Sequence, residues 1–228
     1  MPTLTLFVAI VVAVFAGLCV AAWLMVRRQA MTPWSAWATT GVVCLFWLAI
    51  PAVLASLGAL DSYAPLPTLG FGVMLSVTFG TVLLALTRFG QAFTEAIPLA
   101  AIVGYQVFRF PLELVLHRLY TEGVIPEQMT YTGQNFDIAT GVTAIAVAAG
   151  IYMNRCPRWL IGLWNVVGLV LLFNIVAVAV LSSPVPFRYF TTGPANLLPS
   201  SFPYVWLPTF LVQAALFGHL LVFRAAWR

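Results

Sequence analysis

Long apolar stretches separated by short polar segments recur along the whole chain. Seven of them are long enough to cross a hydrocarbon core of about 30 Å as helices, which takes about 20 residues each. They lie at about 4–26, 37–60, 68–86, 93–120, 136–153, 159–181 and 204–223. The pattern predicts an all-α polytopic membrane protein, a seven-transmembrane-helix bundle formed by one integral membrane domain over residues 1–228.

The arginines predict how this bundle is oriented, because basic residues are retained on the cytoplasmic side of a membrane. With the N-terminus outside, two arginines fall on the outer side, Arg118 and Arg188. Seven fall on the cytoplasmic side: Arg27, Arg28, Arg88, Arg155, Arg158, Arg224 and Arg228. We therefore expect an outer N-terminus, a cytoplasmic C-terminus and a location in a cell membrane of the bacterial inner-membrane type.

The composition excludes several classes of function. The net charge of +4 comes from ten arginines without a basic run, which gives no footprint for nucleic acid. The chain contains no lysine, so it cannot form a retinal or pyridoxal Schiff base. In span count and orientation alone it resembles seven-helix receptors and microbial rhodopsins, and the missing lysine removes a retinal function. We expect no cofactor and no metal.

The fourth predicted span carries most of the polar residues found within apolar stretches. Gln106, Arg109, Glu113 and His117 follow one another at steps of three, four and four. At 100° per residue they occupy an arc of about 80° on one helix face, and Tyr120 extends the same stripe. Counted from Ala92 at about 1.5 Å per residue, Arg109 lies about 25 Å along the span, which places the stripe in the outer third of the bilayer.

Two interpretations of this stripe stay open. In the first, Arg109 and Glu113 neutralise each other and join the fourth span to its neighbours. In the second, the stripe lines an outward-facing cavity where Arg109 offers a fixed positive charge and Glu113 and His117 exchange protons. An ionisable group in hydrocarbon needs a partner or a polar cavity under either interpretation.

Other spans add further candidates, of which Asn174 matches the stripe in depth and Gln213 is expected near mid-depth. Asn135 and Asp137 precede the fifth span, where they would cap its helix or reach the rim of the cavity. Asn174 in the sixth span and Gln213 in the seventh complete the predicted ligand-binding set. His219 is expected near the cytoplasmic end, away from His117. In the fifth span Thr140, Ala144 and Ala148 recur every four positions, which allows a close helix approach.

The leading functional hypothesis is binding, extending to transport, of a small polar or anionic ligand in this outward-facing pocket. One alternative is a structural or assembly subunit of a larger membrane complex. Another is an intramembrane enzyme with a Glu/His acid–base pair, although no catalytic motif supports it. The expected partners are the lipid bilayer, the small ligand, and either other membrane proteins or further copies of this chain.

Overall fold

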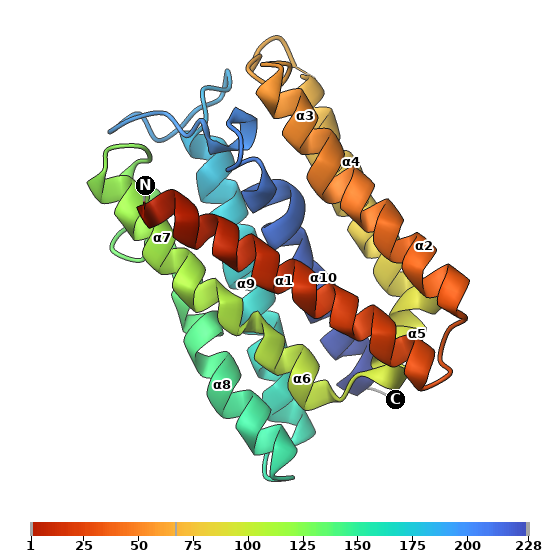
Figure 1. Cartoon of the computed structure of the whole chain (residues 1–228). Coiled ribbons are helices and arrows are strands. Elements are labelled where there is room, and N and C mark those ends of the chain that lie inside the picture. The colour runs from red at the N-terminus through yellow and green to blue at the C-terminus, as the bar shows by residue number, and fades with distance from the viewer. Residues whose placement is uncertain (1, 67, 227–228) are drawn as a thin grey trace.

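The computed structural model describes residues 2–66 and 68–226 and consists of helices and loops, with no strand in that part of the chain (Figure 1). Arg228, counted above for the orientation, lies outside the described residues. The helices are α1 (Pro2–Arg27), α2 (Pro33–Val43), α3 (Ile50–Ser56), α4 (Leu69–Leu86), α5 (Arg88–Ala96), α6 (Leu99–Gly104), α7 (Arg109–Thr121), α8 (Ile138–Tyr152), α9 (Arg158–Ser182) and α10 (Val212–Ala226).

Short turns of other helix types join several of these elements into longer rods. A π-helical turn, Cys44–Ala49, links α2 to α3, and another, Leu207–Leu211, precedes α10. A 3₁₀ turn, Tyr105–Phe108, links α6 to α7. Pro111 has no N–H to donate to the carbonyl of Val107, four residues earlier, and this 3₁₀ turn contains Val107. The chain tightens into this turn just before the proline.

Six of the resulting helices are long and apolar enough to cross a membrane. They are Pro2–Arg27, Pro33–Ser56, Leu69–Leu86, Leu99–Thr121, Arg158–Ser182 and Leu207–Ala226. This is the pattern of a multi-pass membrane protein. The fifth predicted span forms only α8, whose 15 residues extend about 22 Å.

The predicted fourth span, 93–120, was placed wrongly at its start. A separate helix, α5, ends at Ala96, and Ile97 adopts an extended conformation before Pro98. Proline disfavours the α conformation in the residue before it, which explains the break. The spanning helix therefore begins at Leu99, and Arg109 lies ten residues after its start and twelve before its end. Arg109 therefore lies near the middle of this helix, whereas the count along the predicted span placed it toward the outer end.

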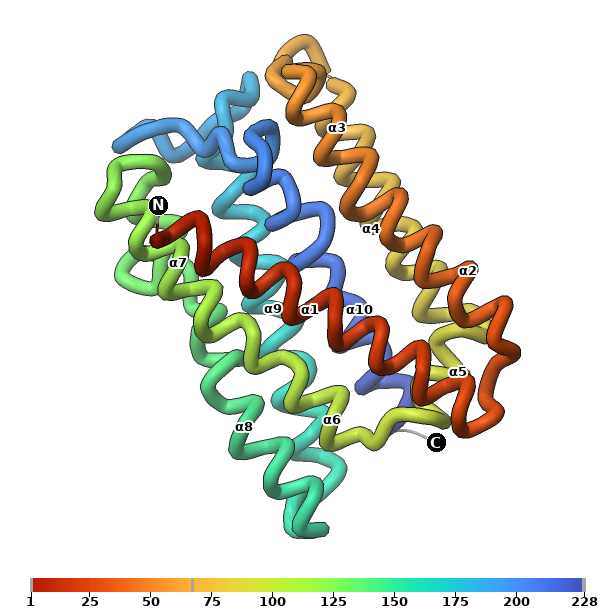
Figure 2. The backbone as a smooth tube through the Cα atoms, viewed as in Figure 1, coloured from red at the N-terminus to blue at the C-terminus, as the bar shows by residue number. Residues whose placement is uncertain are grey.

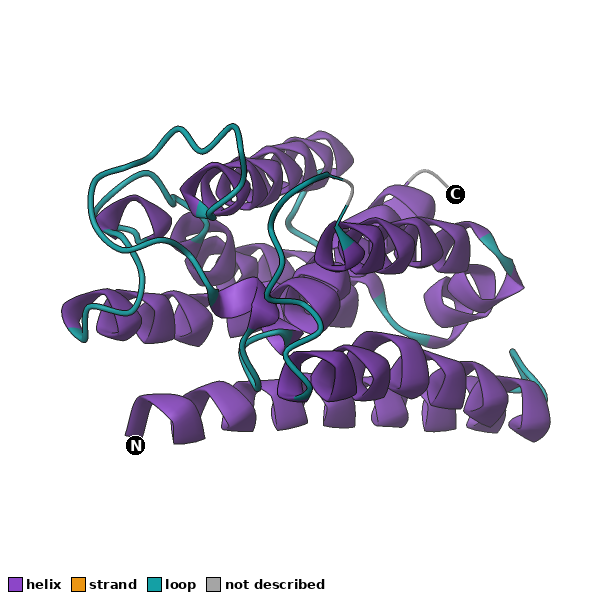
Figure 3. Cartoon of the chain, turned by 90° about the horizontal axis from the view of Figure 1, so that it is seen from above, coloured by secondary structure: helices purple, strands orange, loops and turns teal. Residues whose placement is uncertain are grey.

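The helices pack around α10 and the α6–α7 rod, which are the most buried of the long helices. The path of the backbone shows α3 and α4 on one side of α10 and α7 and α8 on the other, with α1 running obliquely across (Figure 2). The view from above shows the helices lengthwise, with the largest loops toward the left of the picture and shorter connections at the right (Figure 3). α4 and α9 both pack on α10.

Small residues bring α8 against α6 and α7, as the sequence predicted. A Cβ atom placed on Gly141 would lie 2.4 Å from the backbone nitrogen of Phe110. A Cβ on Gly104 would lie 3.4 Å from that of Ala148. Thr140 and Ala144 are buried on the same face. This contact brings the N-terminal end of α8 to the level of Arg109.

Candidate functional site

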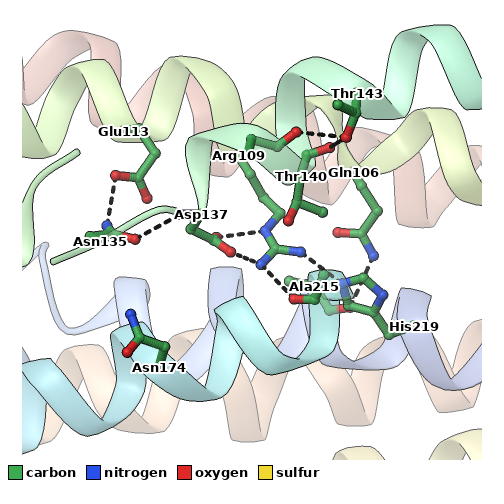
Figure 4. Close-up of polar contacts among 12 residues, drawn as sticks. Gln106, Arg109, Glu113, Asn135, Asp137, Thr140, Thr143, Asn174, Ala215 and His219 are labelled. Carbon is green, nitrogen blue, oxygen red and sulfur yellow. Dashed lines mark hydrogen bonds and ion pairs between the residues drawn. The ribbon is translucent and has the colours of Figure 1, made fainter. Parts of the chain in front are cut away.

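Arg109 and Asp137 form an ion pair that joins α7 to the N-terminal end of α8 (Figure 4). The Nε atom of Arg109 donates to Oδ2 of Asp137 at 2.6 Å, and its Nη2 atom contacts Oδ1. Nη2 also donates to the carbonyl oxygen of Gly168 in α9 at 3.2 Å. Arg109 is 1% exposed, and it is the bulkiest of the fully buried side chains. One of the two interpretations of the stripe paired Arg109 with Glu113, whereas the ion pair in the structure is with Asp137.

His219 completes the surroundings of the guanidinium. Nη1 of Arg109 lies 2.7 Å from Nε2 of His219, and Nδ1 of His219 lies 2.8 Å from Oδ1 of Asn165. Because a guanidinium only donates, Nε2 accepts and the ring proton sits on Nδ1, which donates to Asn165. Asn165 in turn donates to the backbone oxygen of His219 at 3.1 Å. Every side-chain nitrogen of Arg109 therefore has a hydrogen-bond partner at the start of α8, on α9 or on α10.

Glu113 has a different partner from the one expected. Nδ2 of Asn135 donates to Oε2 of Glu113 at 2.6 Å and to the carbonyl oxygen of Met129 at 3.1 Å. Oδ1 of Asn135 accepts from the backbone N–H of Asp137 at 3.1 Å. Asn135 thus holds Glu113 beside the ion pair (Figure 4). Two acidic groups and one basic group meet here, so the cluster carries a charge of −1 when Glu113 is ionised.

The other predicted residues lie elsewhere. Gln106 is buried and donates to the carbonyl oxygen of Ala215 at 3.0 Å. His117 is turned about 80° from Arg109 after eight helical residues, and its ring packs against Tyr131 and Tyr120. Asn174 donates to the carbonyl oxygen of Gln134 at 2.7 Å and stands apart from the cluster (Figure 4). Gln213 lies on α10 and donates to Thr78.

The sequence interpretation missed His219, Asn165 and the carbonyl of Gly168. The reason is depth: with Arg109 assigned to the outer third, a histidine twelve residues into the last long helix was placed too far away. Pro98 was the available signal, because it moves the start of the fourth span by several residues. With that correction Arg109 and His219 come to similar depths.

A cavity of about 360 Å³ adjoins this cluster. Its charged and amide groups come from Arg109, Glu113, Asp137, Asn196 and Gln213, and apolar side chains of α4, α7, α9 and α10 form most of its wall. We call it the Arg109 cavity. Of the nine predicted residues, Arg109, Glu113, Asp137 and Gln213 line it, whereas Gln106, His117, Tyr120, Asn135 and Asn174 do not.

The Arg109 cavity is covered at one end and open at its side. Residues of the α3–α4 loop and of the 183–199 segment line the covered end, where Tyr63 donates to Ser200 at 3.0 Å. Burial raises the pKa of Tyr63, which keeps this phenol protonated as the donor. The rims at the side are formed by Phe71 and Leu75 of α4 and Phe173 of α9, which line the cavity and are 39–58% exposed. The side of the cavity therefore lies between exposed apolar side chains of α4 and α9.

The fold and cluster define a polytopic α-helical membrane protein with a buried charged centre beside an apolar cavity. The chain belongs to the family described as "Domain of unknown function (DUF8737)", whose model matches residues 64–226. The match covers α4 to α10, which contain the whole cluster, and leaves α1 to α3 outside it. No curated protein and no solved structure gives a significant match to this chain.

Proposed function

We propose that this protein binds an amphiphilic ligand within the membrane, with the apolar body in the Arg109 cavity and the polar head at Glu113. The observation that carries the proposal is a carboxyl group on the wall of a cavity whose side is lined by exposed apolar side chains. A water-soluble ligand would have to pass the covered end. A ligand already dissolved in the bilayer reaches the cavity between α4 and α9.

The charges of the cluster indicate which head group fits. Arg109 is neutralised by Asp137 and uses all of its nitrogens within the protein. It is poorly suited to hold an anion, so we revise the expected anionic ligand. Glu113 adds a second carboxyl group at the cavity wall. A cationic head that donates hydrogen bonds would neutralise it, and hydrogen bonds to charged groups are among the stronger ones.

We further propose seven membrane crossings, with α8 and the segment before it forming the fifth. Ile125, Met129 and Asn135 in that segment are buried against the bundle, and Met129 and Asp137 line the cavity. Irregular backbone at membrane depth is tolerated where it is buried in protein or lines a cavity. α1 begins and α10 ends at opposite ends of the bundle, which favours an odd number of crossings (Figure 1).

The positive-inside rule supports an outer N-terminus for this arrangement. α1 ends at Arg27, α5 begins at Arg88 and α9 begins at Arg158, and these three helix ends lie at the same end of the bundle (Figure 1). α7, which carries Arg118 in its last turn, ends at the opposite side. The cavity opening then lies in the outer half of the membrane.

A structural role is the second candidate, and the complete pairing of Arg109 favours it. In that case the cluster only joins α7, α8, α9 and α10, and the cavity holds bulk lipid. The two candidates differ in whether the cavity selects a head group. Binding of a specific amphiphile requires such selection, whereas filling by bulk lipid does not.

The test is photolabelling of the reconstituted protein with three probes of the same chain length. Dodecylguanidinium, dodecyltrimethylammonium and dodecyl sulfate each carry a diazirine in the chain. The first two are permanent cations, and only the first donates hydrogen bonds. We expect dodecylguanidinium to label peptides of α4 and α9 with an affinity about tenfold higher than dodecyltrimethylammonium, as one charged hydrogen bond provides.

Unlabelled dodecylguanidinium should suppress this labelling in a saturable way. Equal labelling by all three probes without saturation would support the structural role instead. Preferential labelling by dodecyl sulfate would restore the anionic ligand and contradict the proposal.

A further inference from the structure

A second cavity, of about 230 Å³, lies beside the other face of α10. Apolar and aromatic side chains of α1, α5, α6 and α10 form most of its wall, among them Leu18, Phe93, Tyr105 and Phe217. We call it the Tyr105 cavity. On α10 and the π turn before it, this cavity uses positions 210–221, whereas the Arg109 cavity uses 207–216. The two cavities are therefore displaced along the bundle.

The remaining lining residues of the two cavities lie toward opposite ends of the protein. The Arg109 cavity includes loop residues Leu60 and Pro199 at the end where the long loops gather. The Tyr105 cavity includes Leu24, near the end of α1, and Ile97, next to Pro98. One cavity thus extends into each half of the membrane-spanning region.

Gln213 lines both cavities. Its side-chain nitrogen donates to Oγ1 of Thr78 at 3.1 Å and to the carbonyl oxygen of Pro208 at 3.0 Å. Its oxygen Oε1 is buried and has no hydrogen-bond partner within residues 2–66 and 68–226, although the residue is only 5% exposed. A buried oxygen without a partner can accept a hydrogen bond from a ligand that has a donor group.

Further polar groups continue on the α4 side of this junction. Thr78 lines the Arg109 cavity and Thr81, about one turn further along α4, lines the Tyr105 cavity. Trp47 donates to Oγ1 of Thr81 at 3.0 Å from the π turn Cys44–Ala49. The other π turn, Leu207–Leu211, lies against this one and contains Pro208. Departures from α geometry of this kind recur at functional sites.

We infer that the two cavities are halves of one passage, and that the amphiphile crosses between the membrane halves at Gln213. This rests on the proposed function, because the head group bound at Glu113 is the one that crosses. A head group that donates hydrogen bonds leaves the carboxylate of Glu113 and then donates to Oε1 of Gln213. One hydrogen-bond acceptor thus replaces the other. No bond is made or broken and no energy source is involved, so the movement follows the concentration gradient of the amphiphile.

The experiment measures crossing in vesicles that contain the full chain. The probe is dodecylguanidinium with the fluorophore NBD at the chain end, and externally added dithionite destroys the fluorescence of the outer leaflet only. We expect the inner-leaflet fraction to decay faster with protein than in protein-free vesicles. The dodecyltrimethylammonium version should cross more slowly because it donates no hydrogen bond.

Gln213→Leu tests the residue itself, since it keeps the size and removes the amide. We expect crossing of the guanidinium probe to slow by about tenfold, the equivalent of one lost hydrogen bond. Gln106→Leu is the matched control. Gln106 is also a buried glutamine with an unpartnered Oε1, yet it lines neither cavity. Its crossing rate should match that of the unmodified protein.

The two proposals fail in different ways. Normal photolabelling with no protein-dependent crossing would overturn the passage and leave the binding site standing. Equal slowing by Gln213→Leu and Gln106→Leu would also overturn it, because the effect would then follow loss of packing. Absence of head-group-selective photolabelling in the unmodified protein would remove the binding site and the passage together.

Discussion

Arg109 and Asp137 lie 28 residues apart in the chain and pair at the centre of the helix bundle. The pair forms because the segment after α7 returns along that helix to mid-depth before α8 begins. This places Asp137 at the start of α8 opposite the middle of the α6–α7 rod. The N-terminal end of a helix favours a carboxylate, which adds to the attraction of the guanidinium.

Removing one member of the pair should destabilise the protein strongly. Arg109→Met leaves the carboxylate of Asp137 buried without its cation, and losing one partner of a buried ion pair costs about 3–5 kcal/mol. We expect a large drop in the thermal midpoint, measured in detergent by fluorescence-detected size exclusion. Arg109→Met combined with Asp137→Leu should recover much of the loss. A single variant as stable as the unmodified protein would contradict the assigned pairing.

Gly168 and His219 should show strong energetic coupling. A Cβ atom on Gly168 would lie 2.6 Å from Cε1 of His219, so Gly168→Ala displaces the imidazole from Arg109. Gly168→Ala and His219→Ala should each destabilise the protein, and the double variant should be more stable than the sum predicts by about 1 kcal/mol or more. The check is a double-mutant cycle of unfolding free energies. Strict additivity would mean that His219 does not depend on this close approach.

Gly141→Ala should disrupt the contact of α8 with the start of α7. The added methyl group meets the backbone nitrogen of Phe110, which cannot rotate away. Gly72→Ala is the matched control, because Gly72 is also helical and has no atom within 4 Å of an added Cβ. Its expected effect is neutral to stabilising by up to about 1 kcal/mol, since alanine favours a helix more than glycine does. Similar thermal midpoints for both variants would contradict the described packing.

Cys156, in the loop between α8 and α9, reports the proposed orientation. In a variant with Cys19→Ala and Cys44→Ala, a membrane-impermeant maleimide should label Cys156 in inside-out vesicles and not in right-side-out ones. Burial raises the pKa of this thiol, so the reactive thiolate is scarce at neutral pH. The labelling rate should rise about tenfold per pH unit until the pH passes the raised pKa. Labelling only in right-side-out vesicles would contradict the proposed orientation and indicate the opposite one.

Hydropathy alone located the six long helices, because a bilayer requires continuous apolar runs whatever the tertiary contacts. It also singled out Arg109 and Glu113, since ionisable groups are rare in such runs. Hydropathy could not predict that Arg109 pairs with Asp137 rather than with Glu113. Glu113 is four residues from Arg109 on the same helix, whereas Asp137 approaches through a loop whose path depends on tertiary packing.

Arg109 was predicted to lie too far from His219 because the effect of Pro98 on the start of the fourth span was not taken into account. Counting a helix from residue 93 ignored the restriction that proline places on Ile97, and it shifted every residue of the fourth span toward the outer surface. The lateral opening of the cavity could not be predicted either. It results from α4 and α9 flanking α10, which a linear pattern does not encode.

The most direct test of the proposed binding site is the effect of Glu113→Gln on photolabelling by dodecylguanidinium. Glutamine keeps the shape and an acceptor for Asn135 but removes the negative charge. We predict that the preference for dodecylguanidinium over dodecyltrimethylammonium falls by about tenfold, as loss of one charged hydrogen bond implies. An unchanged preference in a normally assembled Glu113→Gln protein would contradict a head-group site at Glu113.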